Sequence, residues 1–243
     1  MGLSRRLGLL AAGVGLSLIG GVAQAAETVG MTLQGLLNAG DLAGVSALMP
    51  EADAALWQQR AERFQAEFPQ ARWSVTLAEP DARGLRGLQV DVRGEAERDG
   101  LRYRLEASQS LLVRVEGGRL VEQELLNEQS LLRSGDTALP ITVAIPDQVL
   151  TGSRYDVDVI VDEPLGHAVV AGGLLPLTTE QVRDQLRPSL PMAPLGGGGL
   201  FKSVQAPQRP GAQTWAVMLV HPDGLVTATK RVRVVSVIPR GTI

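Results

Sequence analysis

Few residues of this chain have the chemistry that catalysis needs. The two histidines, His167 and His221, lie far apart in stretches that read as turns, so they do not form a zinc site. The patterns G-x-S-x-G, H-E-x-x-H and G-x-G-x-x-G are absent, which removes the usual signs of an esterase, a metalloprotease or a dinucleotide site. The four glycines at 196–199 precede Leu200 and Phe201, whereas a phosphate loop continues with Lys and Ser or Thr. We therefore expect no metal and no cofactor.

Two groups of carboxylates are close enough in the sequence to suggest a site. A calcium site needs oxygens that converge from a loop, together with backbone carbonyls, and a pair of acids on one strand could exchange protons with a substrate. Because both groups lie along strand-like stretches, we interpret them as solvent-exposed strand faces. The first group comprises Asp156, Asp158, Asp162 and Glu163, and the second Glu122 and Glu124.

The composition is that of an ordinary folded protein without a strong charge. Hydrophobic residues make up 44% and charged residues 20% of the 243 residues, which excludes a disordered chain. With a net charge of -3, the chain lacks the basic field that binds a phosphate backbone, so nucleic acid is not an expected partner. There is no cysteine, and hence no disulfide, no thiolate chemistry and no lipid attached to a cysteine.

The N-terminus has the pattern of a secretory signal peptide. Arg5 and Arg6 give a basic start, residues 7–22 form an uncharged apolar run, and Ala23-Gln24-Ala25 fits a cleavage site. We expect export to the periplasm or the extracellular space after cleavage behind Ala25, by the general or the twin-arginine route. The alternative is an uncleaved membrane anchor over residues 7–25, because the apolar run is near the lower limit for a span.

The first half is organised around a long hairpin that begins at Leu101. Apolar residues occupy most odd positions from Leu101 to Val115, so one face of this strand is predicted to be buried. Gly117-Gly118 turns the chain into a returning strand, and Asp99-Gly100 predicts a tight turn from the preceding strand. The helices expected to cover this sheet are residues 28–49, interrupted at Gly40 and capped by Asp41, and residues 51–70, and the earlier strands are residues 72–77 and 88–97.

This order of helices and antiparallel strands is similar to a known family. The phrase LLNAGDLAGVSALM, residues 36–49, resembles the opening helix pair of the nuclear transport factor 2-like superfamily, and the resemblance covers residues 28–135. It implies an α+β cone, in which a curved antiparallel sheet wraps round the helices and leaves a pocket at its open end. The family includes ketosteroid isomerases, polyketide cyclases and many non-enzymes. This half has no histidine and matches no catalytic motif of the family.

Polar residues of the long hairpin are the candidates for lining such a pocket. An isomerase would need a carboxylate base and a donor for the oxyanion, and Tyr103 with a neighbouring acid is the one combination that qualifies. We interpret Tyr103 as a packing residue instead, because aromatic side chains in strands mostly pack. The pocket candidates are Tyr103, Gln109, Gln123 and Asn127.

A second folding unit is expected after residue 135, where proline becomes frequent. Three of the 14 prolines precede this point and eleven follow it, and short alternating strands separated by Pro and Gly turns continue to the end. The strand around Trp215, the turn at residues 221–224 and a last strand resemble the final hairpin of extracellular immunoglobulin-like modules. We therefore expect residues 136–243 to form an immunoglobulin-like β-sandwich, with one short helix capped by Thr178 and Gln181.

The Pro- and Gly-rich stretch of this second unit is either a contact loop or merely flexible. Function in such sandwiches usually resides on edges and loops. The candidate contact residues are Leu190, Pro191, Met192, Leu200 and Phe201.

Three functions fit these observations. The first is a non-catalytic binding or scaffold protein of the cell envelope, which binds another envelope protein or a small apolar ligand and forms a homodimer through the cone. The second is an isomerase or cyclase acting in the cone pocket. The third is a carrier of hydrophobic ligands, which needs an open apolar pocket of roughly 300 Å³ or more. We expect membrane contact only through an uncleaved N-terminal segment.

Overall fold

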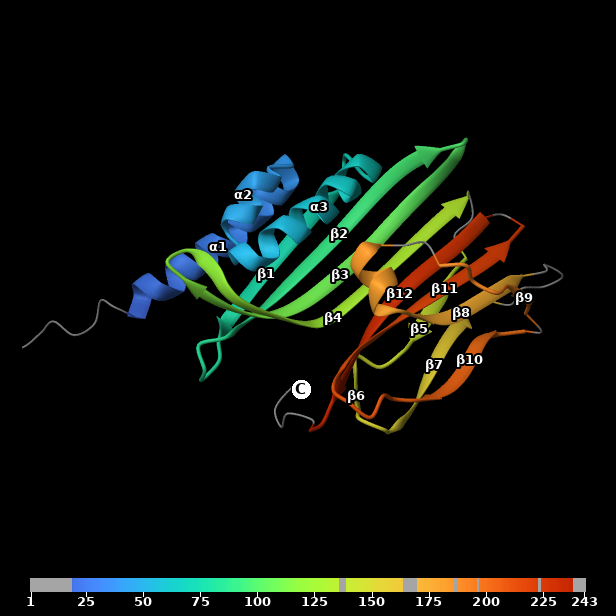
Figure 1. Ribbon diagram of the computed structural model, residues 1–243. Coiled ribbons are helices and arrows are strands. Elements are labelled where there is room, and N and C mark those ends of the chain that lie inside the picture. Colours follow the sequence, from blue (N-terminus) through green and yellow to red (C-terminus); the bar gives the residue numbers. More distant parts are fainter. Residues whose placement is uncertain are drawn as a thin grey trace, which may run out of the picture.

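The computed structural model describes residues 19–135, 139–163, 170–185, 188–195, 197–222 and 224–237, with side chains from Thr28 onward. These residues form a mostly antiparallel β-protein with few helices (Figure 1). Most of the predicted signal peptide, residues 1–25, lies outside them, and the first helix begins at Ile19. No helix within these ranges combines the length and the hydropathy that a membrane crossing requires.

Helices cover the beginning of the chain, and strands make up most of the remainder. The helices are α1 (Ile19–Ala39), α2 (Leu42–Ala47), α3 (Glu51–Glu67) and α4 (Thr179–Asp184). The strands of the first half are β1 (Arg72–Pro80), β2 (Arg86–Arg98), β3 (Leu101–Glu116) and β4 (Arg119–Gly135). Those of the second half are β5 (Ile141–Ala144), β6 (Gln148–Leu150), β7 (Arg154–Val161), β8 (Ala171–Leu177), β9 (Ala193–Pro194), β10 (Gly199–Gln205), β11 (Gly211–His221) and β12 (Gly224–Val235).

The local signals of the first half produce the predicted turns and caps. Asp99 and Gly100 both have positive φ, 53° and 74°, and join β2 to β3, as a two-residue hairpin of the mirror-image turn class requires. Gly117 and Gly118, with φ of 55° and 77°, join β3 to β4. The Asp41 side chain accepts a hydrogen bond from the Gly44 amide and caps α2. These predictions are confirmed.

One sheet of nine strands runs through both halves of the chain. Its strands follow the order β1-β2-β3-β4-β12-β11-β8-β9, and β6 pairs in parallel with β12. The halves meet where β4 pairs with β12 over seven residue pairs, from Gln129 opposite Lys230 to Gly135 opposite Gly224. A smaller sheet has the order β10-β7-β5. The large sheet therefore continues from the first half of the chain into the second across the predicted boundary at residue 135.

The large sheet carries a different cover on each of its faces. Helices α1, α2 and α3 pack on one face of β1–β4, around a core that contains Leu88 and Val113. Directly paired residues share a face, and the pairings that lead from Leu88 across β3 and β4 to Thr227 place Val226 on the opposite face. There the small sheet packs on β12 and β11, around a core that contains Val226 and Leu219 (Figure 1).

The free edge of the large sheet at β1 is covered by side chains of α1. Asn38 accepts a hydrogen bond from the Trp73 amide and donates one to the Trp73 carbonyl, both at 2.9 Å. The Gln34 side chain accepts another from the Val75 amide at 2.9 Å. An uncovered edge strand is a template for pairing with another chain, so these two amides block that reaction along part of β1.

Lys230 is a buried cation where the two halves meet. Its side chain is 7% exposed and points from β12 to the sandwich side of the sheet. The ammonium donates hydrogen bonds to Asn127 Oδ1 at 3.0 Å, to Gln129 Oε1 at 3.2 Å and to the carboxylate of Asp147. Lys230 therefore ties β4 and the segment before β6 to β12.

The second half contains short strands that the sequence did not predict. Strands β6, β9 and β10 lie in stretches that we expected to be irregular. Leu200 and Phe201 belong to β10, which pairs with β7 over its full length, so the prediction that the loop extends to Phe201 is wrong. The four glycines obscure the start of β10 in the sequence pattern. Leu200 and Val204 nevertheless pack against the core with the alternation expected of a strand.

A chain of hydrogen bonds crosses the buried end of the sandwich. Trp215 Nε1 donates to the Tyr155 hydroxyl at 3.0 Å, and that hydroxyl donates to Gln213 Oε1 at 2.6 Å. Burial raises the pKa of Tyr155 above its ordinary value of 10.0, and the bond from Trp215 opposes this rise only in part. The neutral phenol is thus the form that the folded protein favours.

Replacing Lys230 by methionine is expected to destabilise the whole chain. The variant Lys230→Met leaves the acceptors of Asn127, Gln129 and Asp147 without their common donor, so urea unfolding should show a loss of about 2 kcal/mol. Lys202→Met is the control, because Lys202 is the only other lysine and is exposed on β10. The control should lower the free energy of unfolding by less than about 1 kcal/mol. Equal effects of the two variants would contradict the structural role of Lys230.

The alkaline limb of stability should depend on Tyr155. Because its pKa is raised on folding, its contribution is complete below pH 10.0 and is lost as the pH rises through the folded-state value. At neutral pH, Tyr155→Phe should cost about 1 kcal/mol through the lost hydrogen bonds. Urea unfolding measured at intervals between about pH 8 and 12 should show the gap between wild type and variant narrowing above pH 10.0. A gap that widens there would contradict the assignment.

Candidate functional site

Part of the sheet face on the helix side is only partly covered. Cross-strand pairing places Leu105, Leu132, Thr227 and Met218 in one row over four neighbouring strands. Ala107, Ser130 and Thr229 form the next row, also from β3, β4 and β12. All seven side chains are partly exposed. We call this surface the seam face, because it straddles the pairing of β4 with β12.

The alternation along β12 shows the contrast between the two faces. On the sandwich side, Val226, Ala228 and Val232 are 1%, 3% and 0% exposed. On the helix side, Thr227 and Thr229 remain partly exposed. The same strand therefore has one face in a closed core and the other partly exposed.

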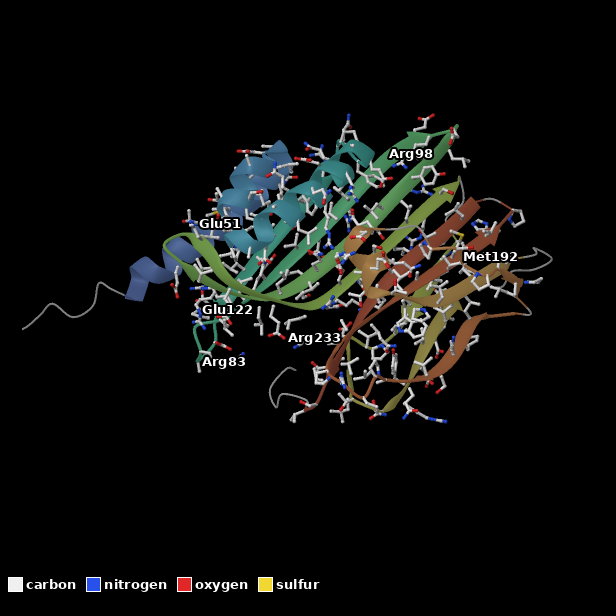
Figure 2. All side chains as sticks on the ribbon, viewed as in Figure 1. Glu51, Arg83, Arg98, Glu122, Met192 and Arg233 are labelled. Atoms are coloured by element: carbon white, nitrogen blue, oxygen red, sulfur yellow. The ribbon has the colours of Figure 1, made fainter. Side chains whose placement is uncertain are left out.

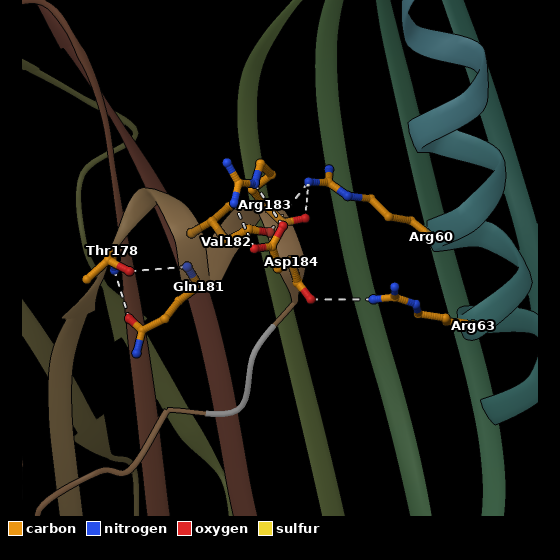
Figure 3. A network of polar contacts seen from close by, with 7 residues as sticks. All are labelled: Arg60, Arg63, Thr178, Gln181, Val182, Arg183 and Asp184. Atoms are coloured by element: carbon orange, nitrogen blue, oxygen red, sulfur yellow. Dashed lines mark hydrogen bonds and ion pairs between the residues drawn. The ribbon is translucent and has the colours of Figure 1, made fainter.

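Helices α3 and α4 lie on the two sides of the seam face, and two arginines connect them (Figure 3). Arg60 Nη2 donates to the Arg183 carbonyl at 2.9 Å and to the Val182 carbonyl at 3.5 Å, and Arg63 Nη1 donates to the Asp184 carbonyl at 3.4 Å. The last carbonyls of a helix have no partner within the helix, and the helix dipole makes that end negative. The two guanidinium groups of α3 thus cap the C-terminus of α4 from outside.

At its other end α4 is closed by its own sequence. Thr178 and Gln181 form the predicted capping box, with hydrogen bonds of 3.1 Å and 2.8 Å (Figure 3). Hydrogen bonds from Arg183 lower the pKa of the Asp184 carboxyl, and the charges of Arg63 and Arg60 lower it further. The C-terminal end of α4 is therefore a cluster of arginines around the Asp184 carboxylate.

Two pairs of polar side chains on and beside the seam face are bonded to each other. Gln109 Nε2 donates to Glu128 Oε1 at 2.6 Å, and the hydroxyls of Ser130 and Thr229 are 2.6 Å apart. Arg231, two residues beyond Thr229 on the same face of β12, differs. Its Nε is buried and has no hydrogen-bond partner, and the described part of the chain gives the guanidinium no ion pair.

Of the four predicted pocket residues, three lie on the helix side of the sheet. Tyr103 and Gln109 share that face of β3 with Leu105, whereas Gln123 bonds to Asp53 at the start of α3, 2.8 Å away. The prediction that Asn127 lines the same surface is wrong. A register shift in β4 beside Asn127 leaves its side chain on the sandwich side, bonded to Lys230.

Tyr103 lies among packing residues at the far end of the β2–β3 hairpin. The guanidinium of Arg98, which Figure 2 labels, stands 5.9 Å from the ring centres of both Tyr103 and Phe68, and Arg98 forms an ion pair with Glu67. On the same face of the hairpin, Glu128 pairs with Gln109, six residues along β3 from Tyr103, or about 20 Å. Glu128 is therefore not next to this phenol.

The candidate contact residues of the second half do not form one surface. Leu190, Pro191 and Met192 pack over Gly173 on the helix side of β8, so closely that a Cβ there would lie 2.7 Å from the Pro191 carbonyl oxygen. Phe201, 63% exposed, lies on the outer face of the small sheet. Met192 is 38% exposed beside β9 (Figure 2).

The remaining candidates of the sequence have structural surroundings. Glu122 pairs with Arg114 at 3.0 Å, and Glu124 pairs with Arg233. His167 lies outside the described residues, and His221 closes β11 rather than standing in a loop. Within the described ranges no group of three or more His, Asp or Glu side chains is arranged to hold a metal ion.

Among the comparisons with known proteins, one family model matches the second half of the chain. The family described as "Domain of unknown function (DUF8623)" matches residues 136–235. No curated protein matches the chain. Among solved structures, red sea bream transglutaminase is similar over 73% of this chain at 12% identity and a TM-score of 0.27. The chain spans 33% of the length of that protein.

Removing the two bridging arginines should loosen α4. In Arg60→Gln/Arg63→Gln, the α4 carbonyls lose charged donors, so amide hydrogen exchange at Val182 and Gln185 is expected to speed up roughly tenfold. The control is Arg83→Gln, since Arg83 is exposed and pairs with Asp81 in a turn of the first half. Unchanged protection of α4 in the double variant would show that the arginines do not hold this helix.

Proposed function

We propose that the protein is a non-catalytic binding protein of the cell envelope and that the seam face is its binding surface. The observation that carries this proposal is the difference between the two faces of β12, one closed in a core and the other partly exposed between α3 and α4. Partly exposed apolar side chains such as Leu132 and Met218 gain free energy when a partner covers them.

The proposal places this surface between two units of known architecture. Residues 28–135 would be a nuclear transport factor 2-like cone, which is supported by three helices that pack on one face of four antiparallel strands. Residues 136–243 would be an immunoglobulin-like sandwich, which is supported by two sheets packed around Trp215 and Val157. The family match that begins at residue 136 supports this boundary. Export through a signal peptide cleaved behind Ala25 is part of the proposal and rests on the N-terminal sequence.

A binding role accounts for the polar groups better than catalysis does. General acid–base chemistry needs a titratable group within hydrogen-bond reach of the substrate. Glu128, on the same face of β4 beside the seam face rows, already accepts a hydrogen bond from Gln109. Tyr103 lies near the Arg98–Glu67 ion pair, and both partners are well exposed at 40% and 48%. An isomerase or cyclase is therefore the less supported alternative.

The test is the binding of a neutral apolar probe to the mature protein. N-phenyl-1-naphthylamine should show a saturable rise in fluorescence, and Met218→Lys should weaken its binding roughly tenfold or more, because an ammonium would have to be buried with the probe. Ile160→Lys is the matched control, since Ile160 is an exposed strand residue on the outer face of β7.

Two results would contradict the proposed function. One is the absence of saturable binding to folded wild-type protein, with folding checked by circular dichroism. The other is equal weakening by both lysine substitutions, which would place the probe somewhere other than the seam face. Turnover of small cyclic ketones or lactones above background would instead favour the isomerase or cyclase.

A further inference from the structure

We propose that the ligand of the seam face is a single-chain amphiphile with an anionic head group. The head lies between Arg231 and Arg60, and the apolar chain lies along β4 and β12. This inference rests on the proposed function, and it adds the chemical class of the ligand and the residues that recognise its charge.

Arg231 is the first reason for an anionic head group. A guanidinium that is partly buried loses hydration, and proteins normally offset this loss with an ion pair or hydrogen bonds. Arg231 has neither among the described residues; its Nε is buried, so a ligand would bind its terminal Nη atoms. The neighbouring Glu128 accepts a hydrogen bond from Gln109 and not from Arg231. A carboxylate or phosphate oxygen would supply the missing partner with favourable geometry.

Arg60 is the second reason, because it faces the same part of the surface from α3. Its Nη2 is held by the carbonyls at the end of α4, whereas its Nη1 has no hydrogen bond to a described residue. Asp53 of the same helix bonds to Gln123, which pairs with Val113 of β3. Arg60 is seven residues further, about 10 Å along the helix, and this brings it near the level of Gln109 and Glu128.

The charges around this end of the seam face favour an anion. Four guanidinium groups, of Arg60, Arg63, Arg183 and Arg231, lie at this end together with two carboxylates, of Glu128 and Asp184. Asp184 is already bound by Arg183 at 2.8 Å and 2.9 Å. The carboxylates thus leave an excess of positive charge where the apolar rows begin.

The part of the surface that continues from Arg231 has the length of an acyl chain. From Arg231 the helix-side residues of β12 continue through Thr229 and Thr227 to Leu225, which is six residues or about 20 Å. Leu132 and Met218 flank this path on the adjacent strands. One leaflet of a membrane has a hydrocarbon thickness of about 15 Å, so a single lipid chain fits along it.

The test compares two amphiphiles that differ only in their head group. Dodecanoate and 1-dodecanol are titrated at neutral pH against mature protein loaded with N-phenyl-1-naphthylamine, and the displacement of the probe is measured. We expect dodecanoate to bind roughly tenfold more tightly than dodecanol. Arg231→Gln should remove this preference and leave the affinity for dodecanol unchanged, whereas Arg231→Lys should retain part of it.

Arg102→Gln serves as the matched control. Arg102 lies on β3, as Leu105 and Ala107 do, but is exposed and adjacent to the β2–β3 turn, so its loss should not alter either affinity. Equal binding of dodecanoate and dodecanol by wild type would overturn the inference and leave the proposed function intact. A preference for dodecanoate that persists in Arg231→Gln would overturn it as well. Failure of the naphthylamine probe to bind at all would instead reject the proposed function.

Discussion

The pairing of β4 with β12 is the contact on which the rest of the structure depends. Seven residue pairs turn a helix-covered sheet and a sandwich into one continuous sheet. Without them, β4 and β12 would each present an open edge, and Leu132 and Thr227 would not be neighbours. Lys230 reinforces this contact from the buried side, since it is bonded to two residues of β4 and to Asp147. The candidate site therefore exists only where the two halves are joined.

Two adjacent residues of β12 have different roles. Lys230 contributes to stability, and Arg231 to the proposed recognition of a ligand. Lys230 is nearly fully buried and has three acceptors, whereas Arg231, on the other face, has a buried Nε without any. A strand sends successive side chains to opposite faces, so a single step along the chain separates a saturated cation from one that lacks a partner. The first contributes to folding, and the second is the group that a ligand can satisfy.

The sequence predicted what short-range chemistry determines. Asp99-Gly100, the Asp41 cap and the Thr178 capping box depend on neighbours within a few residues, and all three were found as expected. The pairing of Ser130 with Thr229 depends on packing between residues 99 positions apart, and no local pattern encodes it. A signal for Lys230 was available, because a lysine interrupts an otherwise apolar alternation from Val226 to Val234. The sequence pattern assigns the arginines of α3 to a solvent-exposed helix face, because only the fold places α4 beside them.

The cover of the β1 edge by α1 has a consequence for the proposed export of the chain. Gln34 and Asn38 precede in the sequence the strand whose backbone they bind. If the leader is removed behind Ala25, as proposed, both amides remain in the mature chain. During N-to-C translocation the segment that blocks the edge would then emerge before the edge itself. This order of residues would thus limit strand exchange between copies of the chain while the sheet is still incomplete.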